Sequence, residues 1–590
     1  MGIPLFTRAL LNSLSQHRKK IEKESGSIGK VDILYLDANS IIHLPTSYER
    51  KTFIKESEYK DVIRLIRKVF EQHIRHFNPK KLLVLAVDGV TPMAKVAEQK
   101  KRRYKNAMNL EENDYDSSLI TPGTEFMFSL DLELRKMVDA LKDEIGIEHV
   151  IYSSHMTPGE GEHKIMQHAR EYLGEYGTPK FAQVLYGNDS DLILLGLALD
   201  TKNLYVCKES FDPRDDKGRN MLKKRGSVLD IDQLHKALNT ELTNRFIGEG
   251  DEPADYFDFI MLCSLLGNDF LPRHPLFCNV DQGVELIMKI LSTMGKIGNK
   301  LDEVMEFLAT LESFEESELS NFSLLGLYQN HLAKEKDSAT KFLKYDSRIF
   351  RAMTKAKKVN GDVFRTLWYR EEFGEFEEEQ LEDVLGMCTS YIRGLFWTIQ
   401  YYLLGQDSVT WLWHYPYYRA PLFRDMAAVY RAINNKKLRK YDDVIDVSPV
   451  ENEIRHTPIH QLLMVMPPQS LRYVPKLLHV YYSKNSSIGY MMPGAGVAVN
   501  QDFCEVPFQE QIIVPHPVYH VIMTKLSALY LQKGEIKEYD PQKPYENHEK
   551  PKPSPYVGRG TYNNSKSVNS GGTSSRGGRG RGMKFTSGRK

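Results

Sequence analysis

The segment Tyr186-Gly-Asn-Asp-Ser-Asp-Leu-Ile-Leu-Leu195 places two carboxylates, Asp189 and Asp191, between two apolar runs. The run before them, 181–186, has the length of a buried strand, and the run after them is typical of a helix. A strand that ends in Asp-x-Asp before a helix points both acids to the carboxyl edge of a sheet, where open α/β sheets bind ligands. Two acids so close repel one another unless a cation lies between them, and their oxygens suit Mg²⁺ or Mn²⁺. A turn Asp followed by a helix-capping Asp explains the pair equally well.

Further acids follow other apolar segments. The apolar runs 31–36 and 82–87 predict buried strands that end at Asp37 and Asp88, and the apolar spacing over 59–77 predicts an amphipathic helix between them. Strands that alternate with helices and end in acids indicate an α/β fold with a parallel sheet whose acids gather at one edge.

Three more acids lie at the boundaries of apolar elements. Glu160 and Glu162 open a helix predicted over about 157–173, and Asp269 follows the apolar stretch 257–266. The helix dipole favours acids in a first turn without any function. The complete set, named the acid cluster here, is Asp37, Asp88, Glu160, Glu162, Asp189, Asp191 and Asp269. Such a set suits two-metal phosphodiester hydrolysis, with metals about 3.5–4 Å apart.

A basic segment follows Asp88. On a helix, four of its side chains would share one face, named the polar helix face here: Lys95, Gln99, Arg102 and Arg103. Arg forks and a Lys point charge suit a terminal phosphate. An ordinary solvated basic helix is the alternative.

Composition bounds the class of protein. The 590 residues suffice for two to four domains, and 41% hydrophobic and 27% charged residues are typical of soluble globular proteins. The five cysteines form no CxxC pair, which argues against a zinc knuckle and a disulfide framework and favours a reducing compartment. No uncharged run reaches transmembrane length, and the first residues lack a signal pattern, so no membrane is expected.

The net charge of +1 is the sum of a basic C-terminal segment and an acidic remainder. Residues 541–590 carry eleven Lys and Arg against two Glu, so the rest of the chain is net negative. This Gly/Arg-rich segment is too polar to fold alone and is expected to be disordered. It either binds RNA loosely or only solubilises the chain.

Six sequence blocks resemble the XRN family of 5′-to-3′ exoribonucleases, whose catalytic part has a PIN-like core shared with flap endonucleases. They are MGIPLF (1–6), LDANSIIH (36–43), VDGVTPMAKVAEQKKRR (87–103), TPGEGEHKI (157–165), GNDSDLILL (187–195) and GNDFLP (267–272). Three downstream blocks, at 391–397, 410–421 and 458–468, extend the resemblance to about residue 480.

The resemblance implies roles for the residues at matching positions. The acid cluster would bind two Mg²⁺ ions, which Mn²⁺ could replace, and the polar helix face would bind a 5′ monophosphate. His43 and a Trp of the 410–421 block, for which we take Trp413 rather than Trp411, would stack on the first base. For each ring alone, a capping or core position is the simpler explanation.

The implied function is processive hydrolysis of single-stranded RNA from a 5′ monophosphate end to 5′ mononucleotides, in RNA decay. Capped and triphosphate ends would be excluded. A monomer is expected, with the decapping machinery as a candidate partner. A flap or structure-specific DNA nuclease on the same core and a non-catalytic RNA-binding scaffold stay open as alternatives.

The implied organisation has four parts. These are a PIN-like nuclease domain with a mixed or parallel sheet and helices on both faces (1–300), a helical linker or insertion (301–385), a mainly helical second region that completes the active site (386–540) and the basic tail (541–590). The chain departs from the family in its length, in Asn188 and Ser190 beside the two acids, and in lacking the zinc knuckle of nuclear members. The last point favours a cytoplasmic location.

Overall fold

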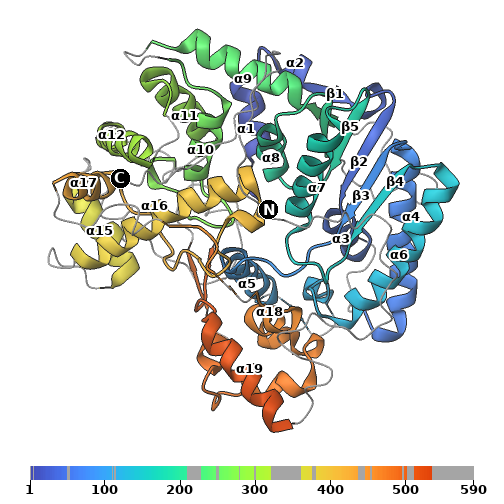
Figure 1. Cartoon of the computed structure of the whole chain (residues 1–590). Helices are drawn as coiled ribbons and strands as arrows, with labels where there is room; N and C mark the ends of the chain where they lie inside the picture. Colours follow the sequence, from blue (N-terminus) through green and yellow to red (C-terminus); the bar gives the residue numbers. More distant parts are fainter. Residues whose placement is uncertain are drawn as a thin grey trace, which may run out of the picture.

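The computed structural model shows an α/β sheet core joined to a large helical region (Figure 1). It describes residues 2–3, 5–48, 54–108, 110–111, 114–208, 227–247, 252–277, 280–297, 301–320, 361–374, 381–435, 446–451, 453, 455–494, 497–500 and 511–533. The basic tail at 541–590 and most of the predicted linker lie outside these residues. No helix within the described ranges is long and apolar enough to cross a membrane.

Seven strands of the described chain form one mixed sheet in the order β1-β7-β6-β5-β2-β3-β4. From β6 to β4 each strand is parallel to its neighbour, and β7 is antiparallel to both β6 and β1. The bounds are β1 Glu22–Glu24, β2 Val31–Asp37, β3 Leu82–Ala86, β4 His149–Ser153, β5 Ala182–Tyr186, β6 Leu204–Lys208 and β7 Ser227–Asp230. A separate hairpin pairs β8 (Ala498–Asn500) with β9 (Gln511–Ile513).

The alternation of side chains along β2 divides the core in two. Leu34 and Leu36 face one apolar cluster, whereas Ile33 and Tyr35 face the other. The first cluster is covered by α3 (Ala38–Tyr48), α4 (Tyr59–Phe77) and α6 (Glu125–Ile145). The second is covered by α1 (Phe6–Ser13), α7 (Gly161–Tyr176), α8 (Asp191–Leu199), α9 (Ile231–Arg245), α10 (Tyr256–Cys263) and α11 (Val280–Met294). A sheet covered on both faces accounts for its continuously apolar strands.

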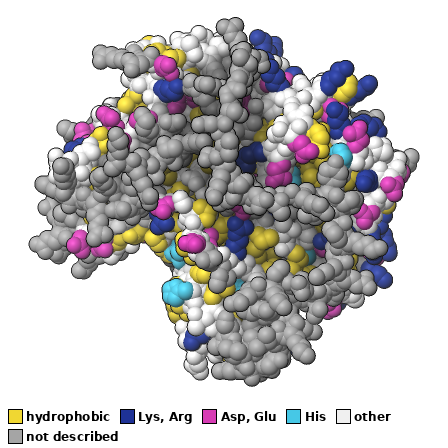
Figure 2. Space-filling model, in the orientation of Figure 1, with side chains coloured by type: hydrophobic (Ala, Val, Ile, Leu, Met, Phe, Trp, Pro, Cys, Tyr) yellow, Lys and Arg dark blue, Asp and Glu magenta, His cyan; other side chains and the backbone are white. Residues whose placement is uncertain are grey.

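The outer faces of α4 and α6 expose both basic and acidic side chains (Figure 2). Arg67 pairs with Glu133, and Arg75 pairs with Glu144, across the two helices. These basic residues are therefore balanced by acids, unlike an RNA-binding stripe.

The helical region continues the second apolar cluster. Its elements are α12 (Leu301–Ser320), α15 (Gly361–Phe373), α16 (Leu381–Leu404) and α17 (Phe423–Asn434), and α12 packs along α17. The described part of the predicted linker thus packs into the body of the protein. A third apolar cluster joins α5 (Met93–Ala107) to α18 (Pro458–Val465) and α19 (Tyr519–Lys533). The short helix α2 spans Arg18–Ile21.

The structure confirms the predicted α/β class and the predicted helices and strands around the acids. The helix predicted over 59–77 has these bounds as α4, and the strand predicted over 31–36 is one residue longer. The helix predicted over 157–173 begins at Gly161, because Glu160 has extended backbone at its N-cap.

Candidate active site

Three neighbouring parallel strands bring acids to one edge of the sheet. β2 ends at Asp37, β3 is followed by Asp88, and β5 is followed by Asp189 and Asp191. The chain runs outward from β2 through β3 to β4 and then returns to the other side of β2 as β5. The carboxyl ends of β2 and β5 therefore flank a topological switch point, which is where such sheets bind ligands.

The N-terminus of α7 brings two more acids to this edge. Glu160 is its N-cap and Glu162 lies in its first turn, and both are buried. The backbone N–H of Gly161 donates to Asp88 Oδ1 at 2.7 Å. A Cβ on Gly161 would lie 3.0 Å from Asp37 Oδ1, so a glycine allows the helix end to approach these acids.

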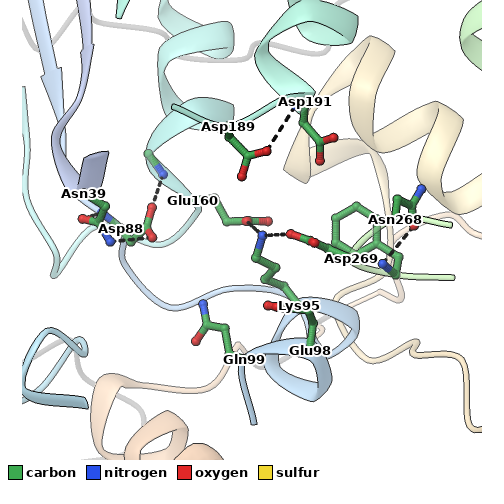
Figure 3. Close-up of polar contacts among 12 residues, drawn as sticks. Asn39, Asp88, Lys95, Glu98, Gln99, Glu160, Asp189, Asp191, Asn268 and Asp269 are labelled. Carbon is green, nitrogen blue, oxygen red and sulfur yellow. Dashed lines mark hydrogen bonds and ion pairs between the residues drawn. The ribbon is translucent and has the colours of Figure 1, made fainter. Parts of the chain in front are cut away.

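The seventh acid is Asp269, and Lys95 of α5 lies between it and Glu160 at the N-terminus of α7 (Figure 3). Its Nζ is 2.6 Å from Glu160 Oε2 and also donates to Asp269 Oδ2. Burial disfavours the charged ammonium, but Asp269 and Glu160 outweigh it and raise the pKa of Lys95 well above its usual value. A buried lysine thus neutralises part of the acid cluster.

All seven predicted acids converge. Each has another member of the acid cluster within electrostatic range: Asp37 has Asp88 and Asp189, Glu162 has Asp189, Glu160 and Asp191, and Asp269 acts on Glu160 and Asp191. Burial, and then repulsion from Asp88, raises the pKa of Asp37 to about 7. Burial and Asp189 raise the pKa of Asp191 to about 7 as well. The cluster therefore concentrates more negative charge than Lys95 alone offsets.

The donor chemistry of the cluster fits hard divalent cations. Seven carboxylates offer only oxygen ligands, which Mg²⁺ and Mn²⁺ prefer. Asp191 Oδ1 is buried and, within the described residues, has no hydrogen-bond partner. As they stand, however, no three or more His, Cys, Asp or Glu side chains of the described chain are arranged to hold a metal ion.

Hydroxyl and amide groups that the sequence analysis missed hold the acids in place. Asn39 Nδ2 donates to Asp88 at 2.6 Å, and Ser40 Oγ donates to Asp37 at 2.6 Å. Both residues lie in the LDANSIIH block (36–43), shortly after Asp37, so their position could have marked them as neighbours of the acids. Tyr401 and Tyr402 of α16 donate to Glu160 at 2.9 Å and to Asp191 at 2.8 Å. Nothing in the sequence relates these tyrosines to acids more than 200 residues away.

The polar helix face lies beside the acid cluster. Its four side chains are on α5, and Arg102 lies within electrostatic range of Asp88, Asp189 and Asp269. Arg103 donates to Thr121 Oγ1 at 2.9 Å and to Gln99 Oε1 at 3.4 Å. Burial, and then repulsion from Arg102, lowers the pKa of Arg103 to about 9. The side chain of Arg102 is 32% exposed, whereas Arg103 is buried. Two guanidinium groups that repel each other in this way form a site that an anion would stabilise.

One acid also lies on α5. Glu98 Oε1 is 3.9 Å from an Arg102 nitrogen, and the side chain of Glu98 is 16% exposed. The sequence analysis did not single it out. Its carboxylate reduces the positive charge that Arg102 presents.

His43 and Trp413 have different surroundings. His43 lies near Arg102 and Asp88, and burial, followed by Arg102, lowers its pKa to about 4, so its ring is neutral at neutral pH. Trp413 is 6% exposed and packs 5.4 Å from Trp397, which stacks on Tyr401. Trp411 is fully buried and donates its Nε1–H to Gln406 O at 3.0 Å. The stacking role of His43 and Trp413 stays a prediction.

Comparison with known proteins identifies the family. Residues 1–210 match the model of the XRN 5′-3′ exonuclease N-terminus, and residues 327–495 match that of the Xrn1 helical domain. Together these matches cover more than half of the chain. The chain belongs to the XRN family of 5′-3′ exonucleases. The second match begins at residue 327, so the family pattern includes much of the range that the sequence analysis assigned to a linker.

Curated relatives are similar over most of this chain. The chain is 26% identical to 5′-3′ exoribonuclease 1 of Schizosaccharomyces pombe, with 80% of this chain and 44% of the relative covered. It is 25% identical to 5′-3′ exoribonuclease 1 of Homo sapiens, with 83% and 32% covered. It is 32% identical to 5′-3′ exoribonuclease 2 of Saccharomyces cerevisiae, with 49% and 35% covered. The chain thus spans less than half the length of these three relatives.

The raised pKa values predict how pH affects the metal-free protein. Asp37 and Asp191 lose their protons near pH 4 when unfolded but near pH 7 when folded, so the folded state binds more protons between these values. The contribution of these two acids to folding stability should therefore fall as the pH rises from about 4 to about 7, and Mg²⁺ should restore it mainly at the higher pH. Thermal melts with and without Mg²⁺ measure this effect.

Asp37→Asn should weaken both the pH dependence and the Mg²⁺ effect. Asp61→Asn, on the exposed surface of α4, is the matched control and should leave both unchanged. A Mg²⁺ effect that is equal in size at both pH values, or that survives Asp37→Asn, would contradict the account of the cluster.

Proposed function

We propose that this chain is a processive 5′-to-3′ exoribonuclease that hydrolyses single-stranded RNA carrying a 5′ monophosphate and releases 5′ mononucleotides. The observation that supports this most is the position of Lys95. It shares α5 with Gln99, Arg102 and Arg103, yet its ammonium lies among the carboxylates of the acid cluster. The anion-binding side chains and the acids thus belong to one continuous site, as cleavage next to a bound terminal phosphate requires.

The acid cluster would hold two Mg²⁺ ions, or Mn²⁺ in their place. Such ions lower the pKa of the attacking water and stabilise the leaving 3′ oxygen. Tyr401 and Tyr402 keep Glu160 and Asp191 oriented from the helical region, and Asn39 keeps Asp88 oriented from the sheet edge.

The polar helix face would bind the 5′ phosphate. Arg102 and Arg103 supply charged forks, and Gln99 supplies an amide donor. Because Gln99 and Arg103 are largely enclosed by protein, the site would fit one phosphate and would exclude a cap or triphosphate by size and by unpaired charge.

A neutral His43 ring and Trp413 would stack on the first base. Stacking is tolerant of sequence and contributes about 1–3 kcal/mol per base, which suits an enzyme that advances along any RNA. Because Trp413 is almost fully buried, base stacking requires its ring to become accessible.

The wider setting is also a proposal. We propose that the chain acts as a monomer in cytoplasmic RNA decay, on RNA supplied by the decapping machinery, as its resemblance to the family implies. Cys263 and Cys388 are buried and form no disulfide within the described part of the chain, which accords with a reducing compartment.

A time course on one single-stranded RNA with three different 5′ ends tests the function. With Mg²⁺, the 5′-monophosphate form should be degraded to mononucleotides much faster than the triphosphate or hydroxyl forms. Asp191→Ala should lower the rate on the order of 100-fold or more, because a metal ligand is lost. Internal fragments or equal rates on all ends would contradict the proposal, and faster cleavage of flapped DNA would favour a structure-specific DNA nuclease. RNA binding without turnover would favour a scaffold.

Arg102→Ala tests the phosphate site. Loss of a charged hydrogen-bonding fork should lower kcat/KM on the monophosphate RNA about 10- to 100-fold and leave residual cleavage of the hydroxyl RNA unchanged. Lys101→Ala removes the same charge from the same helix, at a side chain that lies over Tyr418, and is the matched control. If end preference survives Arg102→Ala, or if Lys101→Ala abolishes it equally, the site is assigned wrongly.

A further inference from the structure

A buried chain of hydrogen bonds runs from the backbone of the segment before α5 to Gln99. The N–H of Thr91 donates to Gln461 Oε1 at 3.0 Å, and Gln461 Nε2 donates to Gln99 Oε1 at 3.0 Å. Gln461 lies on α18 and is fully buried, and Gln99 is 2% exposed. None of the roles assigned above uses Gln461.

The direction of this chain is fixed by chemistry. A backbone N–H can only donate, so Gln461 must turn its amide oxygen to Thr91 and its amide nitrogen to Gln99. Gln99 must then present its own oxygen to Gln461. His456 Nε2, 3.3 Å from Gln461 Oε1, and Arg103, which donates to Gln99 Oε1 at 3.4 Å, are consistent with the same assignment.

The amide nitrogen of Gln99 therefore points to the opposite side. Figure 3 shows this nitrogen on the side of the acid cluster and the oxygen on the side away from it. An amide NH₂ donates to phosphate oxygens, whereas the amide oxygen would repel them. An unrestrained glutamine could turn either group to the site, because the two have nearly the same shape.

We infer that Gln461 is a positioning residue that sets the donor side of Gln99 toward the terminal phosphate of the RNA. The inference rests on the proposed function. It deepens that function, because Gln461 lies in the segment that matches the Xrn1 helical domain and Gln99 in the segment that matches the exonuclease N-terminus. Recognition of the RNA end is thus shared by both segments.

The packing of α18 on α5 makes this arrangement rigid. Met93 and Val96 of α5 share one apolar cluster with Leu462 and Leu463 of α18. Because the helices are held by buried apolar contacts, the amide of Gln461 has little freedom to move.

A purely structural role for Gln461 makes a different prediction. If the residue only joins the two helices, its loss should lower activity on every RNA end alike, through loss of folded protein. If it positions Gln99, its loss should affect only the ends that carry a phosphate. The 5′ end of the substrate therefore separates the two roles.

The test compares Gln461→Met with the unaltered protein on the same single-stranded RNA with a 5′ monophosphate or a 5′ hydroxyl. Methionine keeps the volume but can neither donate nor accept these bonds. The KM for the monophosphate RNA should rise about 10-fold, with kcat and the rate on the hydroxyl RNA within about 2-fold. In a Gln99→Ala background, Gln461→Met should cause no further loss of end preference.

Ser470→Ala is the matched control. Ser470 is fully buried and donates to Ser118 at 3.3 Å, so the change also breaks a buried contact between the two family-matching segments, but away from Gln99. It should leave the preference for the monophosphate unchanged.

Gln461→Glu covers the case in which the methionine variant does not fold. Glutamate keeps the bond from Thr91 but cannot donate to Gln99, so the monophosphate preference should fall, and most of this fall should disappear in the Gln99→Ala background. Equal losses on both ends, or losses that add to those of Gln99→Ala, would overturn the inference while leaving the proposed function intact. An unaltered protein without monophosphate preference would overturn both.

Discussion

The structure depends on holding seven carboxyl groups close together at one edge of the sheet. Burial and mutual repulsion both oppose ionisation, as the raised pKa values of Asp37, Asp191 and Glu162 show. Three kinds of contact offset this cost: the ammonium of Lys95, hydrogen bonds from side chains such as Asn39 and Tyr402, and the N-terminus of α7. In the proposed function, divalent cations bound by these carboxylates would offset the repulsion further.

The helical region is part of this site and does not merely cover it. Tyr401 and Tyr402 reach the acids from α16, and Gln461 reaches the polar helix face from α18. The helix α5 lies between the two and contacts both, through Lys95 on one side and Gln99 on the other. A chain cut between the two family-matching segments would lose these bonds, so the sheet core and the helical region are best regarded as one functional unit.

Much of the fold and of the acid cluster could be predicted from local patterns. Asp37 and Asp88 follow apolar strands, and parallel strands with a switch point bring such residues to one edge. Tyr401 and Gln461 could not be predicted in this way, because their partners lie hundreds of residues away and neither residue type in a helix indicates an active site. Trp413 shows the opposite case. The sequence block around it predicted a base-stacking role, but its burial against Trp397 depends on packing that only the structure shows. The division into four domains and the role of the tail stay predictions.

Crystals grown with Mn²⁺ and a single-stranded RNA test the central claim most directly. The account predicts two anomalous scattering peaks about 3.5–4 Å apart within the acid cluster, beside an RNA phosphate. Manganese bound elsewhere, or an acid cluster still neutralised by Lys95 with RNA in place, would contradict it.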